Sequence, residues 1–118
     1  PLSWTKARPS SPVNILHIHG TADTVNLYHG NQIFGVPYPG AETGIRNWAY
    51  YAFGNAIPLE QTTRRDLDEE IKGNETVVKS WADGRIELWT IEGGRHVPPF
   101  VDDFNRQIID WMYAHPKP

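Results

Sequence analysis

The sequence predicts part of a layered α/β domain, in which helices cover a sheet of largely parallel strands. Two observations favour this class. Short apolar runs end in glycine at Gly20 and at Gly93-Gly94, as is typical of strands buried in a parallel sheet. Two other segments carry apolar residues at helical spacing. Two or three strands cannot form a complete sheet beneath both helices. The domain is therefore expected to be incomplete without further strands.

Composition limits the possible functions. The 118-residue chain fits one small domain, and its 11 Lys and Arg against 14 Asp and Glu give a net charge of −3. This balance argues against partners such as nucleic acid or an anionic membrane surface. Because the chain has no cysteine, a disulfide framework and a thiolate nucleophile are excluded. The proline- and serine-rich residues 1–12 are expected to be a linker or truncated connection of a longer gene product, leaving residues 13–118 as the domain.

The first half of the domain is expected to contain a strand, a loop and a helix. The apolar run Val13–Gly20 predicts a buried strand. The segment Thr21–Glu42 has no sustained period, which predicts a long functional loop. The following helix should begin with Thr43 as N-cap and end at Gly54. Its core-facing residues would be Ile45, Trp48, Ala49 and Ala52.

The second half is expected to begin with an irregular surface segment, Ala56–Asn74, which includes a solvated acidic stretch from Asp66 to Glu70. The stretches "ETVVKSW" and "RIELWTIEGG" then read as two strands, and the Asp83-Gly84 pair between them predicts a hairpin. The last segment, Val101–His115, should form an amphipathic helix that Pro116 ends. Its apolar stripe would contain Phe104, Ile108, Trp111 and Met112.

A polar residue follows each strand that ends in glycine. Asp23 comes after "HIHG", and His96 comes after "TIEGG". The acid and base of an acyl-transfer triad occupy such loops, because the carboxyl ends of adjacent strands aim them at one pocket. The order Asp before His matches the α/β-hydrolase triad, whose serine comes first in the chain. The sequence therefore predicts Asp23 and His96 as catalytic residues, with the serine upstream of residue 1.

Four stretches together carry a resemblance to a known family: "HIHGTADTVNLYHG", "GNETVVKSW", "IELWTIEGGRHVPP" and "IIDWMYAHP". They resemble the C-terminal half of the polyhydroxybutyrate depolymerase and feruloyl esterase family of α/β-hydrolases, over nearly all of Val13 to His115. The resemblance implies a secreted serine carboxylesterase that needs neither cofactor nor metal. Its substrate would be an ester of a short-chain or hydroxycinnamic acid, or a polyester. Asp23 would fix the tautomer of His96, and His96 would be the general base.

The chain also departs from the family's pattern. The family's nucleophilic serine lies in a turn flanked by glycines. None of the serines of this chain has glycines at that spacing: they are Ser3, Ser10, Ser11 and Ser80. The oxyanion donors next to that serine are absent for the same reason. Family members often have a cysteine after the helix that ends at Gly54, where this chain has Asn55. The chain alone is therefore expected to be inactive and to need the upstream half of its domain. A sheet cut in the middle exposes an edge, so association with that half or with a second copy is expected.

The residues also allow other interpretations. Asp23 and His96 could be ordinary loop residues of a non-catalytic binding or assembly module built on the same framework. His17 and His19 lie at i and i+2 of a strand and so share one face, where they could bind a metal with Asp23 and His29. The tryptophans could form a sugar- or aromatic-binding platform, although their phases favour core burial: Trp48, Trp81, Trp89 and Trp111.

Overall fold

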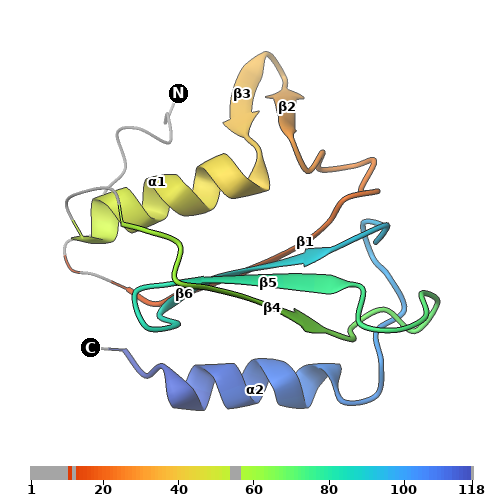
Figure 1. Ribbon diagram of the computed structural model, residues 1–118. Helices are drawn as coiled ribbons and strands as arrows, with labels where there is room; N and C mark the ends of the chain where they lie inside the picture. Colours follow the sequence, from red (N-terminus) through yellow and green to blue (C-terminus); the bar gives the residue numbers. More distant parts are fainter. Residues whose placement is uncertain (1–10, 12, 54–56, 118) are drawn as a thin grey trace.

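The computed structural model describes residues 11, 13–53 and 57–117 (Figure 1). A four-stranded sheet of order β1-β6-β5-β4 lies between two helices, and β2 and β3 form a separate hairpin. The described residues thus form a small α/β domain, which confirms the predicted class and its flanking helices. The elements are β1 (Ile15–Gly20), β2 (Gly30–Ile33), β3 (Val36–Pro39), α1 (Ala41–Phe53), β4 (Gln61–Arg65), β5 (Thr76–Trp81), β6 (Ile86–Ile91) and α2 (Phe104–Ala114).

The sheet is mixed, whereas a largely parallel sheet was predicted. Only β1 and β6 pair in parallel; β5 pairs antiparallel with β6, and β4 pairs antiparallel with β5. The predicted hairpin is confirmed as β5 and β6. It makes the sheet mixed, because a short turn can join only antiparallel strands. Strand β4 lies in the segment that was expected to be irregular. Its sequence, QTTRR, is polar on both faces and largely exposed, so hydrophobic alternation gives no signal for it.

Strand β6 is the centre of the core, and every residue from Ile86 to Ile91 is buried. Alternation divides its side chains between the two faces of the sheet. Ile86 and Leu88 pack with residues of α1, while Trp89 packs with residues of α2 on the other face. Trp81 and Trp89 are both buried in these clusters, which confirms the expectation of core burial for these two tryptophans.

Both helices differ from their predictions in detail. Helix α1 begins at Ala41, because the carbonyl of Gly40 already accepts a hydrogen bond from the N–H of Gly44 (2.8 Å). The predicted N-cap Thr43 therefore lies inside the first turn. The predicted end, Gly54, and the neighbouring Asn55 lie outside the described residues.

In α2 the predicted apolar stripe is wrong at one residue. Phe104, Ile108 and Trp111 pack against the sheet, but Met112 is 59% exposed. At about 100° per residue, Ile108 and Trp111 lie within about 40° of Phe104 around the helix, while Met112 lies about 80° away. Met112 therefore lies outside the stripe of α2 that faces the sheet.

Two segments that were expected to lack structure do not. The predicted loop Thr21–Glu42 contains the β2–β3 hairpin, whose turn residues Phe34 and Gly35 have φ of 49° and 76°. Phenylalanine is an unusual residue at such a turn position, so this turn has no recognisable hairpin motif. The acidic stretch is not simply solvated either, because Leu67 and Asp68 are buried and both donate their N–H to the carboxylate of Glu75.

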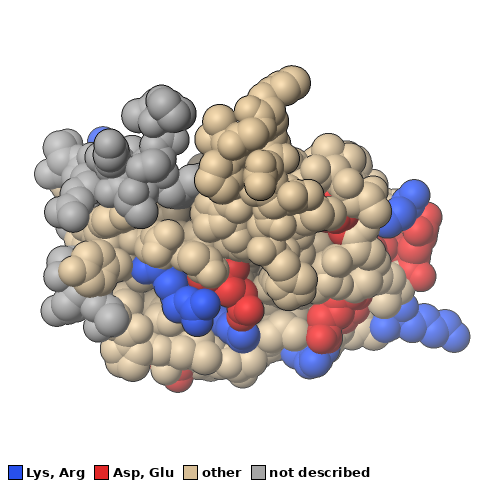
Figure 2. Space-filling model, turned by 90° about the horizontal axis from the view of Figure 1, so that it is seen from above, with Lys and Arg blue, Asp and Glu red and all other residues tan. Residues whose placement is uncertain are grey.

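The surface carries mixed charge. Figure 2 shows acidic and basic side chains interspersed on one face, with no broad area of a single sign. Among the described residues the two helices have 13 and 11 residues, and neither is long and apolar enough to cross a membrane.

Candidate active site

The parallel pair β1–β6 brings the two predicted site residues together. Gly20 and Ile91, the last residues of the two strands, are paired in register. The loops beyond them are joined by backbone hydrogen bonds from Thr21 N–H to the Ile91 carbonyl (3.0 Å) and from Ala22 N–H to the Gly94 carbonyl (2.9 Å). Asp23 and His96, 73 residues apart, thus occupy neighbouring loops at one edge of the sheet.

Two glycines permit this close approach. A Cβ added to Gly20 would lie 2.2 Å from the carbonyl oxygen of Gly94, and one added to Gly94 would lie 2.6 Å from Cγ2 of Ile91. Both separations are far below van der Waals contact. Gly20 therefore allows the close approach of the two loops that carry Asp23 and His96, and Gly94 allows the turn that follows β6.

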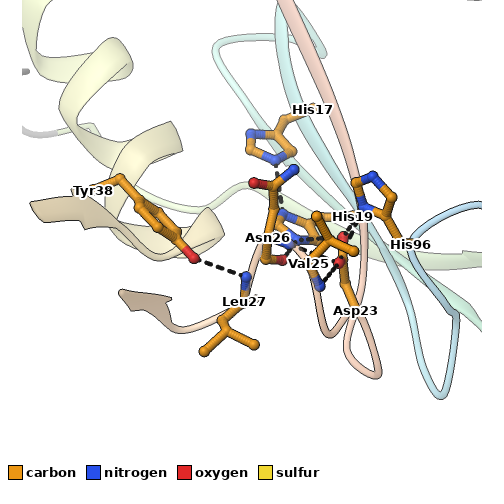
Figure 3. Close-up of polar contacts among 8 residues, drawn as sticks. All are labelled: His17, His19, Asp23, Val25, Asn26, Leu27, Tyr38 and His96. Carbon is orange, nitrogen blue, oxygen red and sulfur yellow. Dashed lines mark hydrogen bonds and ion pairs between the residues drawn. The ribbon is translucent and has the colours of Figure 1, made fainter. Parts of the chain in front are cut away.

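Asp23 and His96 form a hydrogen-bonded pair (Figure 3). Nδ1 of His96 lies 2.9 Å from Oδ2 and 3.1 Å from Oδ1 of Asp23. The Asp23 side chain is only 6% exposed, and that of His96 is 40% exposed. A carboxylate can only accept, so this network assigns the hydrogen to Nδ1 and leaves the lone pair on Nε2. Figure 3 shows that second ring nitrogen directed away from Asp23.

The loop after β1 holds the carboxylate in place. Oδ1 of Asp23 accepts hydrogen bonds from the N–H groups of Val25 (2.9 Å) and Asn26 (2.8 Å). Burial raises the pKa of Asp23, but the hydrogen bonds from His96, Asn26 and Val25 outweigh it, so the pKa lies below its ordinary value. Asp23 is therefore ionised at neutral pH and can stabilise a protonated imidazole beside it.

This lowered pKa predicts a dependence of stability on pH. A carboxyl group with a lower pKa in the folded than in the unfolded state stabilises the fold above its unfolded pKa, and this contribution is lost as the pH falls through the folded value. The wild-type chain should therefore have a higher free energy of unfolding than Asp23→Asn, by a constant amount above about pH 5. This difference between the two proteins should shrink below about pH 4. Urea denaturation of both proteins across this range measures it. A difference that stays constant down to about pH 2 would contradict the prediction.

A depression of about 480 Å³ opens beside the pair. Besides Asp23 and His96, its lining includes Ile33 and Tyr38 of the β2–β3 hairpin and Phe100 of the loop that leads to α2. The Tyr38 hydroxyl accepts the N–H of Leu27 (3.0 Å), which ties the hairpin to the loop that carries Asp23 (Figure 3). The site thus combines an imidazole, a buried carboxylate and apolar walls, which suits a ligand with an apolar group next to a polar one.

The two histidines of β1 do not assemble the alternative metal site. His17 and His19 share a face, as their spacing predicted, and their rings stack with centroids 5.5 Å apart. Nε2 of His17 lies 3.3 Å from Nδ1 of His19, and Nε2 of His19 lies 2.7 Å from the carbonyl oxygen of Asn26. His29 packs instead against the ring of Tyr28. In the part of the chain that the structure describes, no three His, Asp or Glu side chains are grouped to hold a metal ion.

The serines of the described residues lie away from His96. Ser80 is paired in register with Glu87, at the opposite end of β6 from His96, and its hydroxyl donates to the carboxylate of Glu87 (2.5 Å). Ser11 comes before β1, whose far end leads to Asp23. Ser3 and Ser10 lie outside the described residues.

Sequence reasoning missed the groups that hold Asp23. The two backbone donors had a local signal, because an aspartate side chain in a loop often accepts the backbone N–H groups of the residues just after it. The contacts of His19 with Asn26 and of Tyr38 with Leu27 had none. They depend on how β1 and the unpredicted hairpin lie against the loop.

Comparison of the chain with protein-family models, with curated proteins and with solved structures gave no match.

Proposed function

We propose that this chain supplies the acid and the general base of a serine carboxylesterase of the polyhydroxybutyrate depolymerase or feruloyl esterase type. The observation that carries the proposal is the 2.9 Å contact between Nδ1 of His96 and the buried carboxylate of Asp23. A half-exposed imidazole held in this way has its Nε2 lone pair available for a substrate-side proton. The nucleophilic serine would lie on a further segment of the domain.

In the proposed reaction, Nε2 of His96 takes the proton of the serine hydroxyl as its oxygen attacks the ester carbonyl. The tetrahedral intermediate then loses the alcohol, which leaves with the proton from His96, and an acyl-serine remains. His96 next removes a proton from water, which attacks the acyl-serine, and returns that proton to the serine oxygen as the acid is released. Asp23 stays ionised throughout and stabilises the imidazolium at each step.

The free edge of the sheet supports the location of the missing serine. Among the described strands β1 has a neighbour on one side only, β6, so the backbone groups of its other side can pair with an added strand. A parallel strand added beside β1 would have its carboxyl end next to Gly20. A serine in the turn after that strand would face the loops of Asp23 and His96.

The walls of the depression support an ester with an apolar acyl or alcohol group, because Ile33, Tyr38 and Phe100 line it. The choice between a short-chain ester, a hydroxycinnamic ester and a polyester rests on the family resemblance, as does secretion. No step of this mechanism calls for a cofactor or metal.

Hydrolysis of p-nitrophenyl acetate tests the proposal. The assay compares this chain, shown by intact mass to be free of other polypeptide, with a longer polypeptide extended upstream through the next glycine-flanked serine. We expect turnover and a stable adduct with a serine-directed fluorophosphonate only in the longer polypeptide, and we expect His96→Ala and Asp23→Ala to abolish the turnover.

Two outcomes would contradict it. Turnover by the short chain that survives both substitutions would place the chemistry elsewhere in the molecule. Absence of turnover and of the adduct in both polypeptides would favour a non-catalytic binding or assembly module.

A further inference from the structure

The histidines of β1 have no part in the proton transfers proposed above, yet they join the site through one continuous set of contacts (Figure 3). Nε2 of His17 lies 3.3 Å from Nδ1 of His19. Nε2 of His19 lies 2.7 Å from the carbonyl oxygen of Asn26. The N–H of the same Asn26 donates to Oδ1 of Asp23 (2.8 Å). The chain of contacts therefore ends on the carboxylate that holds His96.

The partners assign the hydrogens along this chain. The carbonyl of Asn26 can only accept, so Nε2 of His19 carries a hydrogen, and Nδ1 of a neutral His19 is then an acceptor. His17 must in turn donate from Nε2. Burial, and next the neighbouring His19, lower the pKa of His17, which agrees with a neutral ring at this end of the chain. Every contact thus has one donor and one acceptor.

His19 is itself held firmly. Its side chain is 13% exposed, and its ring meets Tyr28 edge to face, with centroids 5.4 Å apart. The Tyr28 hydroxyl shares a buried hydrogen bond with the hydroxyl of Thr90 on β6 (2.8 Å). Nε2 of His19 also lies 3.4 Å from Oδ2 of Asp23. His19 therefore connects the sheet to the loop that carries Asp23.

We propose that His19 is a positioning residue, whose bond to the carbonyl of Asn26 fixes the turn that aims the Asp23 carboxylate at His96. The carbonyl of Asn26 then accepts a hydrogen bond from His19 of β1, while its N–H donates to the carboxylate of Asp23. The catalytic consequence rests on the proposed esterase function, but the effect on the turn does not.

Amide hydrogen exchange, measured by NMR on the 118-residue chain, tests the effect on the turn. His19→Leu removes the donor, and we expect exchange at the N–H of Asn26 and Val25 to become about five- to tenfold faster, the equivalent of one hydrogen bond. The amides of β5 and β6 should be unchanged. His19→Gln keeps a side-chain N–H donor and should stay within about twofold of the wild type. His17→Leu is the matched control, because it removes a stacked imidazole from the same face but no bond to the loop.

Unchanged exchange at Asn26 in His19→Leu would overturn the proposal, as would an equal acceleration in His17→Leu. If His19→Leu does not fold, His19→Gln decides: wild-type exchange at Asn26 supports the proposal, and faster exchange in a folded sheet overturns it. In an active longer polypeptide, His19→Leu should lower kcat about tenfold with KM unchanged, and His19→Gln should restore it. A longer polypeptide without turnover would refute the esterase function and leave the exchange result standing.

Discussion

If the longer polypeptide has the proposed esterase activity, Asp23→Asn is expected to lower its kcat by about four orders of magnitude with the fold intact. The reason lies in the two backbone donors. The N–H groups of Val25 and Asn26 both point at the Oδ1 position, so the asparagine keeps its oxygen there and must present its NH₂ group to Nδ1 of His96. Nδ1 then becomes the acceptor and the hydrogen moves to Nε2, where the base needs its lone pair.

Steady-state kinetics with p-nitrophenyl acetate, together with circular dichroism to verify folding, measure this effect. Asp110→Asn is the matched control. Asp110 is an exposed residue of α2, on the face of the sheet opposite α1 (Figure 1), and its substitution should leave kcat within about twofold. A loss of less than about tenfold in Asp23→Asn would show that Asp23 does not set the tautomer of His96.

Gly20→Ala is expected to lower the free energy of unfolding by about 3 kcal/mol, at the upper end of the cost of overpacking. The added Cβ would lie 2.2 Å from the carbonyl oxygen and 2.5 Å from the carbonyl carbon of Gly94. Both atoms belong to the backbone, so no side-chain rotation relieves the contact and the two loops must move apart. The same movement should lengthen the contact between Asp23 and His96 and reduce activity in the longer polypeptide.

Urea denaturation of the 118-residue chain measures the change in stability. Gly44→Ala provides the control, because Gly44 is also buried but lies in α1, and the nearest atom to its added Cβ is Cγ of Pro39 at 3.7 Å. Alanine is favoured over glycine inside a helix, so this variant should be neutral or more stable by up to about 1 kcal/mol. If Gly20→Ala stays within about 0.5 kcal/mol of the wild type, close packing of the two loops does not limit stability.

The elements that the sequence predicted correctly are those with a local signal. The strand that ends at Gly20 and the hairpin around Asp83-Gly84 have apolar runs and turn residues next to each other in the chain. The elements that it missed depend on a distant partner. Strand β4 is polar and becomes a strand by pairing with β5, and the β2–β3 hairpin turns at Phe34-Gly35 with a residue that rarely takes a positive φ.

For the site, the sequence by itself determined which residues are candidates, Asp23 and His96, and their places in the loops just after two apolar strands. Whether they meet depended on the parallel pairing of β1 and β6, which brings together two residues 73 positions apart in the chain and has no local signature. Only the tertiary structure decided how the acid is held. The close approach of Gly20 to Gly94 and the contact of His19 with the carbonyl of Asn26 are distances between β1 and the loops beside it. Such distances are set by how strands and loops pack together, and residue type and spacing along the chain do not contain them.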